Sequence, residues 1–509
     1  MYSNIAEKNL VYILLIGLFI IGLYNLDGYG ISWDEPIQRI TGKLNYDYIF
    51  YDDPALLDWK DRDYGVAFEL PLIAVERIIN LTDTRDIYLS RHLITHIFFL
   101  IGALFAFKII DFLYQNKLLA TIGFLLIVLQ PRLYAHSFFN TKDIPFMSMF
   151  VICLYLSAIA LDKRTIMSFI LLGIGVGILI NLRIMGVLLP FCVGVFLIID
   201  MIKDKKYWQH IKLGLLFTVA FVFILYVCWP LLWKDPIQNF ILAFKNMSRF
   251  RWGGTVLFNG DLISAKELGW NYIPVWFSVT TPIIYLITGL FGVILLMVRF
   301  FKNPLKYLFD NKERLNLLFL ICCFAPVIVV ILLQSRLYDG WRQLYFIYPS
   351  FVLLIIYGLD FLIKKNMKKL VAVSYFLTFG YIAVDMIRSY PLQNVYFNQF
   401  VSLAPPEHIR QTFEMDYWGV SYKQSLEYIL RNDHCRLINI AVANYPGNAN
   451  INILPAADRE RINYVPVEEA TYFITNYRWH PHDYEEFERF RYHSIKIRNN
   501  TVSEIFKLK

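Results

Sequence analysis

Long apolar segments separated by short polar connections dominate the first three-quarters of the chain. About eleven of them are long enough to cross a bilayer, which takes about 20 mostly apolar residues in a helix. They lie at about 10–27, 90–113, 118–134, 144–161, 166–181, 184–201, 211–232, 282–300, 315–334, 343–363 and 369–387. The pattern predicts a mainly α-helical, polytopic transmembrane bundle of about eleven spans over residues 1–387.

After residue 387 the apolar density drops and the periodicity changes. Residues 422–431 have the spacing of an amphipathic helix. Three segments, 437–443, 470–475 and 492–498, have the composition of short strands. This alternation predicts a small α/β domain over residues 388–509.

The composition supports a membrane protein and excludes several other classes. The chain is 57% hydrophobic and only 18% charged, which is more apolar surface than a soluble domain requires. Its net charge of +8 comes from basic residues between the apolar segments, so we exclude a nucleic-acid partner. Of six cysteines, five lie in apolar segments and none forms a CxxC pair, which argues against redox chemistry and a thiolate metal site.

The basic residues also predict the orientation of the bundle. They cluster in four short connections, at 163–164, 203–212, 299–314 and 364–369. With about eleven spans, all four share a side with the N-terminus, and the positive-inside rule makes that side cytoplasmic. The N-terminal segment has no small-residue cleavage site and is interpreted as an uncleaved first span. Loops 28–89 and 233–281 and the C-terminal domain are then exoplasmic.

An acidic pair follows directly after the first span, in the sequence Gly-Ile-Ser-Trp-Asp-Glu-Pro, where it contributes Asp34 and Glu35. Polar residues often only mark the end of a span, but Asp27 already does so here. A carboxylate at this position can act as general base toward an acceptor hydroxyl. Alternatively, one of the two can bind a divalent cation.

A second polar cluster lies between the third and fourth spans and contains Arg132, His136, Lys142 and Asp143. Cations on an exoplasmic turn oppose the positive-inside tendency, which indicates another role, and binding of a lipid phosphate suits them. Asp143 can alternatively cap the fourth span, because Asp is favoured at helix N-termini. His136 is either an interfacial histidine with satisfied hydrogen bonds or a base.

Two further exoplasmic turns carry charged candidates. Arg183 lies between two apolar segments, where an unpaired arginine is costly. The turn after the ninth span contributes Arg336, Tyr338, Asp339 and Arg342. An arginine–aspartate pair with a structural role is the alternative for this turn. A cluster of cations facing carboxylates suits the transfer of a group from a phosphate, because the cations stabilise the departing charge.

These motifs together resemble the C-type integral-membrane glycosyltransferases, and most of all the branch with the protein O-mannosyltransferases and the aminoarabinose transferase of lipid A. The matching motifs are Ser-Trp-Asp-Glu at 32–35, Thr-Lys-Asp-Ile-Pro at 141–145, Tyr-Asp-Gly-Trp-Arg at 338–342 and Asp-Tyr-Trp-Gly at 416–419. Oligosaccharyltransferases share the superfamily, but the chain has no WWDYG-like motif.

The resemblance implies a polyprenyl-phosphate-linked sugar donor, such as an undecaprenyl-phosphate hexose, and inversion at the anomeric carbon. It assigns Asp34 as the base and Asp143 as a second acidic residue of the site. Lys60 or Arg62 would correspond to a donor-phosphate cation of some relatives. Some members use a divalent cation and others do not, so a metal cofactor stays open. The implied location is the cytoplasmic (inner) membrane of a bacterium.

The favoured hypothesis is a glycosyltransferase that modifies an exoplasmic acceptor, such as O-antigen, another cell-surface glycan, a lipid or a protein hydroxyl. A transporter or flippase for lipid-linked sugars is the alternative, against which stand the absence of repeated halves and the placement of charge at helix ends. A structural component without catalysis is the third possibility. Its polar clusters would tolerate substitution.

Overall fold

The computed structural model of the chain describes residues 2–248 and 252–509, so residues 249–251 of the predicted loop 233–281 lie outside it. The fold is mainly helical, as predicted. Within the described residues, nine helices are long and apolar enough to cross a bilayer. Seven of them are the single helices α4 (Thr84–Tyr114), α7 (Asp143–Lys163), α10 (Tyr207–Val227), α13 (Ile283–Lys302), α15 (Asn311–Leu332), α16 (Ile347–Lys364) and α17 (Lys368–Arg388). The other two include a short 3-10 turn: Asn9–Gly28, most of which lies in α1 (Tyr2–Asn25), and Ile184–Asp204, which contains α9 (Leu188–Asp204).

The predicted third and fifth spans differ from simple transmembrane helices. Segment 118–134 is divided into α5 (Lys117–Val128) and α6 (Pro131–Phe139), which meet at an angle of 61° and count together as a tenth candidate span. The break falls where Pro131 opens α6 and the Gln130 side chain accepts from Leu133 N at 2.8 Å. The fifth segment, α8 (Ile166–Leu182), has 17 residues and is about 26 Å long, slightly less than a bilayer core.

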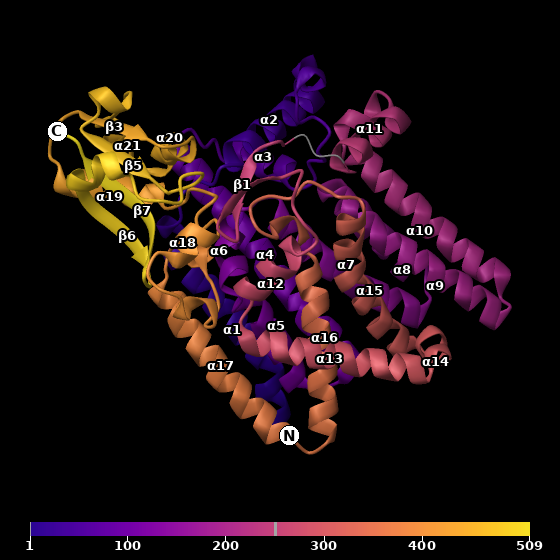
Figure 1. Cartoon of the computed structure of the whole chain (residues 1–509). Coiled ribbons are helices and arrows are strands. Elements are labelled where there is room, and N and C mark those ends of the chain that lie inside the picture. The colour runs from indigo at the N-terminus through magenta and orange to yellow at the C-terminus, as the bar shows by residue number, and fades with distance from the viewer. Residues whose placement is uncertain (1, 249–251) are drawn as a thin grey trace.

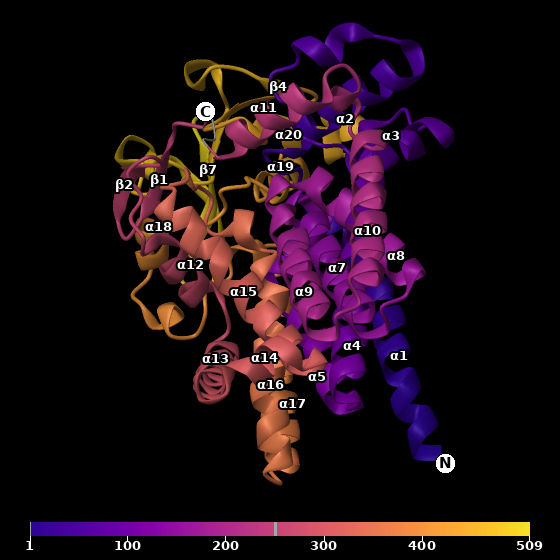
Figure 2. The same ribbon diagram turned by 90° about the vertical axis from the view of Figure 1, so that its right-hand side faces the viewer.

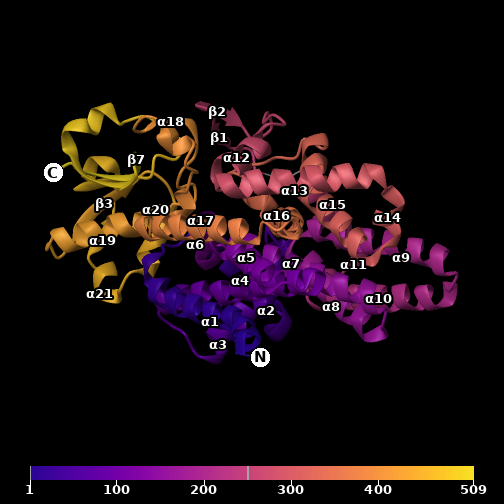
Figure 3. The same cartoon turned by 90° about the horizontal axis from the view of Figure 1, so that it is seen from below.

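Helices α4, α5, α7 and α16 lie in the middle of the bundle when it is viewed along its length (Figure 3). Among the candidate spans, α7 and α16 have the largest share of residues buried inside the protein, whereas α1 lies at the edge of the bundle. Close packing depends on small residues. A Cβ on Gly292 of α13 would lie 2.0 Å from the carbonyl oxygen of Leu354 on α16, so these helices approach each other through a glycine.

The four basic connections lie at the same end of the bundle as the N-terminus, together with the short helix α14 (Pro304–Phe309) (Figure 2). A buried ion pair joins three helices there: Arg314 of α15 contacts Asp200 of α9 at 2.7 Å. Arg164, at the end of α7, contacts the same carboxylate at 3.0 Å. This end is the one that the positive-inside rule assigns to the cytoplasm.

Shorter elements cover the opposite end of the bundle (Figure 2). The predicted loop 28–89 is largely helical, and the described part of loop 233–281 holds two helices and a hairpin. The elements are α2 (Glu35–Tyr51), α3 (Glu69–Ile78), α11 (Pro236–Ser248), β1 (Thr255–Phe258), β2 (Asp261–Ser264) and α12 (Tyr272–Thr280).

The residues after α17 form a five-stranded mixed sheet with short helices, at the left of Figure 1. The strand order is β4-β3-β5-β7-β6, with β3 parallel to β4 and β5 and the remaining pairs antiparallel. The elements are α18 (His408–Thr412), α19 (Tyr422–Asn432), β3 (Ile438–Val442), α20 (Pro446–Ala449), α21 (Ala456–Arg459), β4 (Ile462–Tyr464), β5 (Tyr472–Thr475), β6 (Arg491–Ile497) and β7 (Asn500–Lys507). The predicted helix and three predicted strands are confirmed as α19, β3, β5 and β6.

This C-terminal region packs directly on the segment that follows α1. Asn450 accepts a hydrogen bond from Ile31 N at 2.8 Å and donates one to Ile31 O at 2.9 Å. Trp33 N donates to Trp418 O at 3.0 Å. The C-terminal region has its own hydrophobic core, in which Leu426 and Ile429 of α19 pack on the buried residues of the sheet. The acidic pair after the first span therefore lies between the bundle and the sheet.

Candidate functional site

The turn between α6 and α7 carries Asp143 into the protein interior. Asn140 folds this turn locally, because its Oδ1 accepts from Asp143 N at 2.8 Å and its Nδ2 donates to Asp143 Oδ2 at 3.0 Å. The buried Asp143 carboxylate also contacts Arg183, at the end of α8, and Arg342 Nη1 at 3.3 Å. Two turns that are far apart in sequence are thus joined through one carboxylate.

Arg342 is the centre of this ion-pair cluster. Its Nη1 lies 3.2 Å from Asp34 Oδ2, and its Nη2 lies 3.1 Å from Asp339 Oδ2. The guanidinium also lies over the rings of Tyr338 and Trp418, at 4.9 and 4.5 Å from their centroids. Arg342 is buried, whereas the Asp34 side chain, just before α2, is 31% exposed. Asp34 is therefore held on one side and accessible on the other.

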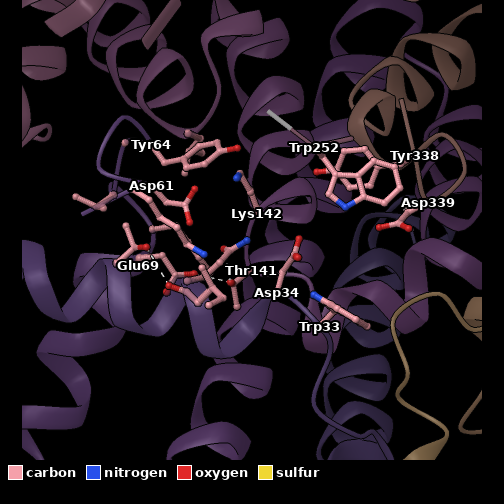
Figure 4. A pocket seen from close by; sticks show the side chains of 18 of the residues that line it. Trp33, Asp34, Asp61, Tyr64, Glu69, Thr141, Lys142, Trp252, Tyr338 and Asp339 are labelled. Atoms are coloured by element: carbon pink, nitrogen blue, oxygen red, sulfur yellow. Dashed lines mark hydrogen bonds between the residues drawn. The ribbon is translucent and has the colours of Figure 1, made fainter. Parts of the chain in front are cut away.

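Asp34 and Lys142 open onto the same cavity, of about 420 Å³ (Figure 4). The cavity is polar and aromatic, and the predicted residues Lys60, Tyr338 and Asp339 line it as well. The ring of Tyr338 stacks on that of Trp252 at 4.5 Å, so two aromatic side chains cover one wall. The structure thus brings the first acidic motif and the lysine turn, about a hundred residues apart in sequence, to one pocket.

A second cavity, of about 640 Å³, lies beside the first and is apolar along most of its length. Its wall is formed by side chains of α9 and α15, among them Leu188, Phe191, Val329 and Leu333. Two of the predicted cations, Arg183 and Arg336, are among its lining residues. The described residues that line both cavities are Tyr64, Lys142 and Tyr338.

Lys142 stands at this junction with its ammonium nitrogen 3.1 Å from the centroid of the Tyr64 ring. Burial, followed by the repulsion of the Arg183 guanidinium, lowers the pKa of Lys142 to about 7. Asp34 and Asp143 oppose this shift by favouring the charged form. The lysine is therefore poised to gain or lose its proton near neutral pH.

Six predicted site residues are outside the described linings of both cavities: Glu35, Arg62, Arg132, His136, Asp143 and Arg342. Asp143 and Arg342 belong instead to the buried ion-pair cluster beside Asp34. Glu35 is buried in a pair with His92 Nε2 at 2.9 Å and accepts from Ser32 N at 2.7 Å. Its contacts indicate a structural role at the start of α2.

Arg132 and His136, both on α6, contact neighbouring residues of the protein interior. Arg132 Nε donates to Tyr396 O at 2.9 Å, and its guanidinium lies 4.9 Å from the Phe397 ring. His136 Nδ1 lies 3.1 Å from Asn140 Nδ2, so the histidine supports the turn before Asp143. Arg132 lies outside the described linings of both cavities, so its predicted contact with a phosphate stays a prediction.

The sequence did not single out three charged residues that line the polar cavity: Asp61, Glu69 and Arg478. Glu69 begins α3, pairs with the buried Arg91 and accepts from the Thr141 hydroxyl. Arg478 follows β5 in the C-terminal region and lies 2.7 Å from Asp339 Oδ1. An acidic residue at a helix start and an arginine beside a tryptophan are common surface features, so neither carried a usable signal.

A metal site is not assembled from these carboxylates. Among the residues described, no group of three or more His, Cys, Asp or Glu side chains is placed to hold a metal ion. Asp143 and Asp339 each contact two arginines instead. The described carboxylates therefore do not fit a cation site.

The geometry defines a class of membrane protein. It is a polytopic helical bundle in which the polar cavity lies beside the second cavity, which is called the apolar groove below. Residues 88–231, from α4 to the end of α10, match the family model described as dolichyl-phosphate-mannose-protein mannosyltransferase. This segment includes Lys142, Asp143 and Arg183. The match confirms the predicted resemblance to the branch of C-type glycosyltransferases that contains the protein O-mannosyltransferases.

Among solved structures, the chain is similar to ArnT from Cupriavidus metallidurans bound to undecaprenyl phosphate, with 11% identity, 98% of each chain covered and a TM-score of 0.45. The apo state of that protein matches with 10% identity over 97% of each chain and a TM-score of 0.47. The Archaeoglobus fulgidus oligosaccharyltransferase, in complex with Zn and sulfate, matches with 10% identity over 81% of this chain and 59% of that one, with a TM-score of 0.42. No curated protein matches the chain.

Proposed function

We propose that the protein is a membrane glycosyltransferase that moves one sugar from a polyprenyl-phosphate carrier to an acceptor hydroxyl, with Asp34 as general base. The observation that carries the proposal is the meeting of an apolar groove and a polar cavity at Lys142, with Asp34 on the polar side. A lipid-linked sugar has the same division, because an apolar chain and a polar ring are joined through one phosphate.

The groove between α9 and α15 suits the lipid chain of the donor. Its wall is aliphatic and aromatic, so an isoprenoid chain that enters from the bilayer exchanges contacts with lipid tails for similar contacts with apolar side chains. Phe191 and Leu333 line the groove and are 70% and 61% exposed on the outside of the bundle. A chain can therefore enter sideways from the bilayer. Undecaprenyl phosphate is the carrier we propose, since the expected location is a bacterial membrane.

The donor phosphate would lie at the junction, among Lys142, Arg183 and Arg336. Arginine offers a fork of donors to phosphate oxygens, and lysine adds a compact charge. Lys142, with its pKa near 7, takes up a full proton when a negative phosphate arrives. The same cations stabilise the phosphate as it leaves, which lowers the barrier only if they are already in place.

Asp34 would receive the proton of the acceptor. Its side chain points into the polar cavity (Figure 4), and Arg342 holds one carboxylate oxygen at 3.2 Å. The acceptor oxygen forms a bond to the anomeric carbon as the bond from that carbon to the phosphate oxygen breaks. The proton passes to Asp34, and the polyprenyl phosphate departs with the electron pair. One displacement from the opposite face inverts the anomeric configuration.

The acceptor we propose is a saccharide, such as O-antigen or another cell-surface glycan. Aromatic rings of Trp33, Trp252 and Tyr338 line the polar cavity beside carboxylates and the Gln38 amide. Sugar rings pack their C–H faces on aromatic side chains and donate hydroxyls to carboxylates. A lipid or a protein hydroxyl is the alternative that acceptor panels would reveal.

The positive-inside rule supports a proposed orientation of the protein in the membrane. The basic end of the bundle would face the cytoplasm of a bacterium, and the cavities would open toward the periplasm. Residues 1–387 would then be a transmembrane domain in the inner membrane, and residues 388–509 a periplasmic domain above it.

Purified protein incubated with undecaprenyl-phosphate hexoses and candidate glycans, lipids and peptides tests this function. We expect release of polyprenyl phosphate and a glycosylated product. Asp34→Asn should lower kcat by about 10²- to 10⁴-fold, the usual contribution of a general base. Asp58→Asn is the matched control, because Asp58 is an exposed carboxylate of the same loop.

Equal turnover by Asp34→Asn and the wild type would remove Asp34 from the base position. Movement of an intact lipid-linked sugar across vesicles, without cleavage, would instead favour the flippase alternative.

A further inference from the structure

We infer that Arg478, supplied by the C-terminal sheet region, is a positioning residue for Asp34, an inference that rests on the proposed function. Arg478 lies just after β5, almost completely buried, and lines the polar cavity. It reaches Asp34 by two separate routes, one through ion pairs and one through aromatic rings. Together these contacts link Arg478 to the Asp34 side chain and to the residue that precedes it.

The first route runs through the ion pairs. Arg478 Nη2 lies 2.7 Å from Asp339 Oδ1, and the other oxygen of Asp339 lies 3.1 Å from Arg342 Nη2. Arg342 Nη1 then lies 3.2 Å from Asp34 Oδ2. Because Asp339 is shared between two arginines, the direction in which Arg342 presents its donors depends on Arg478.

The second route runs through the residue that precedes the base. The Arg478 guanidinium contacts two indole rings, 4.8 Å from the centroid of Trp33 and 4.6 Å from that of Trp479. The two rings meet edge to face at 5.7 Å. Trp33 is covalently adjacent to Asp34, so its packing on Arg478 limits how the backbone of the base moves. A guanidinium within about 6 Å of an aromatic ring is attracted to it, so both contacts are favourable.

Both routes are anchored in the C-terminal region by its backbone. Arg478 Nη1 donates to Tyr417 O, and the next residue, Trp418, accepts from Trp33 N at 3.0 Å. The Trp418 ring also lies 4.5 Å from the Arg342 guanidinium. The region thus holds Trp33, Arg342 and Arg478 in one frame.

Such a frame has a chemical consequence for a partly exposed base. Within the described part of the chain, Asp34 forms an ion pair with Arg342 alone and its side chain also faces the cavity, so its rotamer depends on that arginine. A displacement of about 1 Å from the reactive geometry costs on the order of 10²-fold in rate. Loss of Arg478 is therefore expected to lower kcat while the lipid groove and the binding of the donor stay intact.

A merely structural role would look different, and the chain offers a matched control. Arg459 also joins the C-terminal region to the bundle, through an ion pair with Asp83, but it is not among the described residues of the cavity. The experiment compares the full-length wild type with Arg478→Gln, Arg478→Lys and Arg459→Gln. It measures kcat, KM for the undecaprenyl-phosphate sugar and the melting temperature in detergent.

We expect Arg478→Gln to lose about 10- to 100-fold in kcat with KM for the donor nearly unchanged. Arg478→Lys keeps the charge but cannot bind Asp339 and Tyr417 O as one planar fork, so its kcat should be intermediate. Arg459→Gln should keep the wild-type kcat. Combining Arg478→Gln with Asp339→Asn should lower kcat little further, because both changes interrupt one path.

Each other result has a definite meaning. If Arg478→Gln and Arg459→Gln have the same kcat, the inference is overturned and the proposed function is not. The same holds if Arg478→Gln loses kcat only because its melting temperature falls below the assay temperature. If Arg478→Gln does not fold, a wild-type kcat in Arg478→Lys overturns it as well. A wild type that transfers sugar from none of the lipid-linked donors overturns the proposed function and the inference with it.

Discussion

Lys142 is expected to make donor binding depend on pH near neutrality. Its pKa in the free protein is lowered to about 7 by burial and by Arg183, whereas a bound phosphate favours the charged lysine. As the pH rises through 7 the free protein loses this proton, and binding must restore it. A sugar phosphodiester keeps a single negative charge throughout, so the donor adds no titration of its own. The KM for the donor should therefore rise with pH.

The size of the effect follows from the cost of taking up the proton. Each pH unit above the pKa adds about 1.4 kcal/mol to donor binding. At about pH 8.5 the penalty reaches roughly 2 kcal/mol, which raises the KM about 30-fold over its value below pH 7. Lys142→Arg should remove the dependence, because a guanidinium stays charged at every pH of the assay.

The assay is the KM for undecaprenyl-phosphate sugar between about pH 6 and pH 8.5, for the wild type and Lys142→Arg side by side. The ratio of the two KM values cancels titrations that both proteins share. We expect the ratio to be flat below about pH 7 and to rise tenfold per pH unit above it. A ratio that stays constant over the whole range would refute the assignment of Lys142 to the phosphate.

Three further outcomes are expected elsewhere in the protein. Val329→Trp narrows the apolar groove and should raise the KM for long-chain donors several-fold but not for short-chain analogues; equal effects on both would contradict a lipid chain in the groove. Arg314→Met should lower the stability by about 3–5 kcal/mol in detergent unfolding, because it leaves buried Asp200 with one partner, and Arg314→Met/Asp200→Leu should recover most of the loss. Burial raises the pKa of Glu414 to about 8, so the folded protein holds a proton that the unfolded chain releases above about pH 4.5, and stability falls as pH rises toward 8. Glu414→Gln should flatten that slope in pH-dependent unfolding; an unchanged slope would place the titration elsewhere.

Periodicity was enough to predict most of the architecture. The segment 437–443 anticipates β3 (Ile438–Val442), and 422–431 anticipates α19 (Tyr422–Asn432). β7 was missed because seven of its eight residues are buried, so its two faces do not alternate in polarity. Hydrophobicity does not predict the division of segment 118–134, because Pro131 stands within a continuous apolar segment.

The site was predictable only where charge stood out against an apolar background. Lys142 and Arg183 were visible for that reason, and both line the cavities. The roles of neighbours were not, since sequence does not show what a side chain contacts. Glu35 is adjacent to Asp34 in sequence, but its carboxylate pairs with His92, nearly sixty residues away. Arg478 is even more remote, and only the packing of the sheet on the bundle brings it to the cavity.

That remoteness bears on how the protein is made. A ribosome delivers residue 478 after every membrane helix has emerged, so the wall that Arg478 contributes is among the last parts to exist. A nascent or prematurely terminated chain can insert its helices and fill the lipid groove while this wall is missing. Chemistry at the proposed base would then wait until residue 478 has been added and the wall is in place.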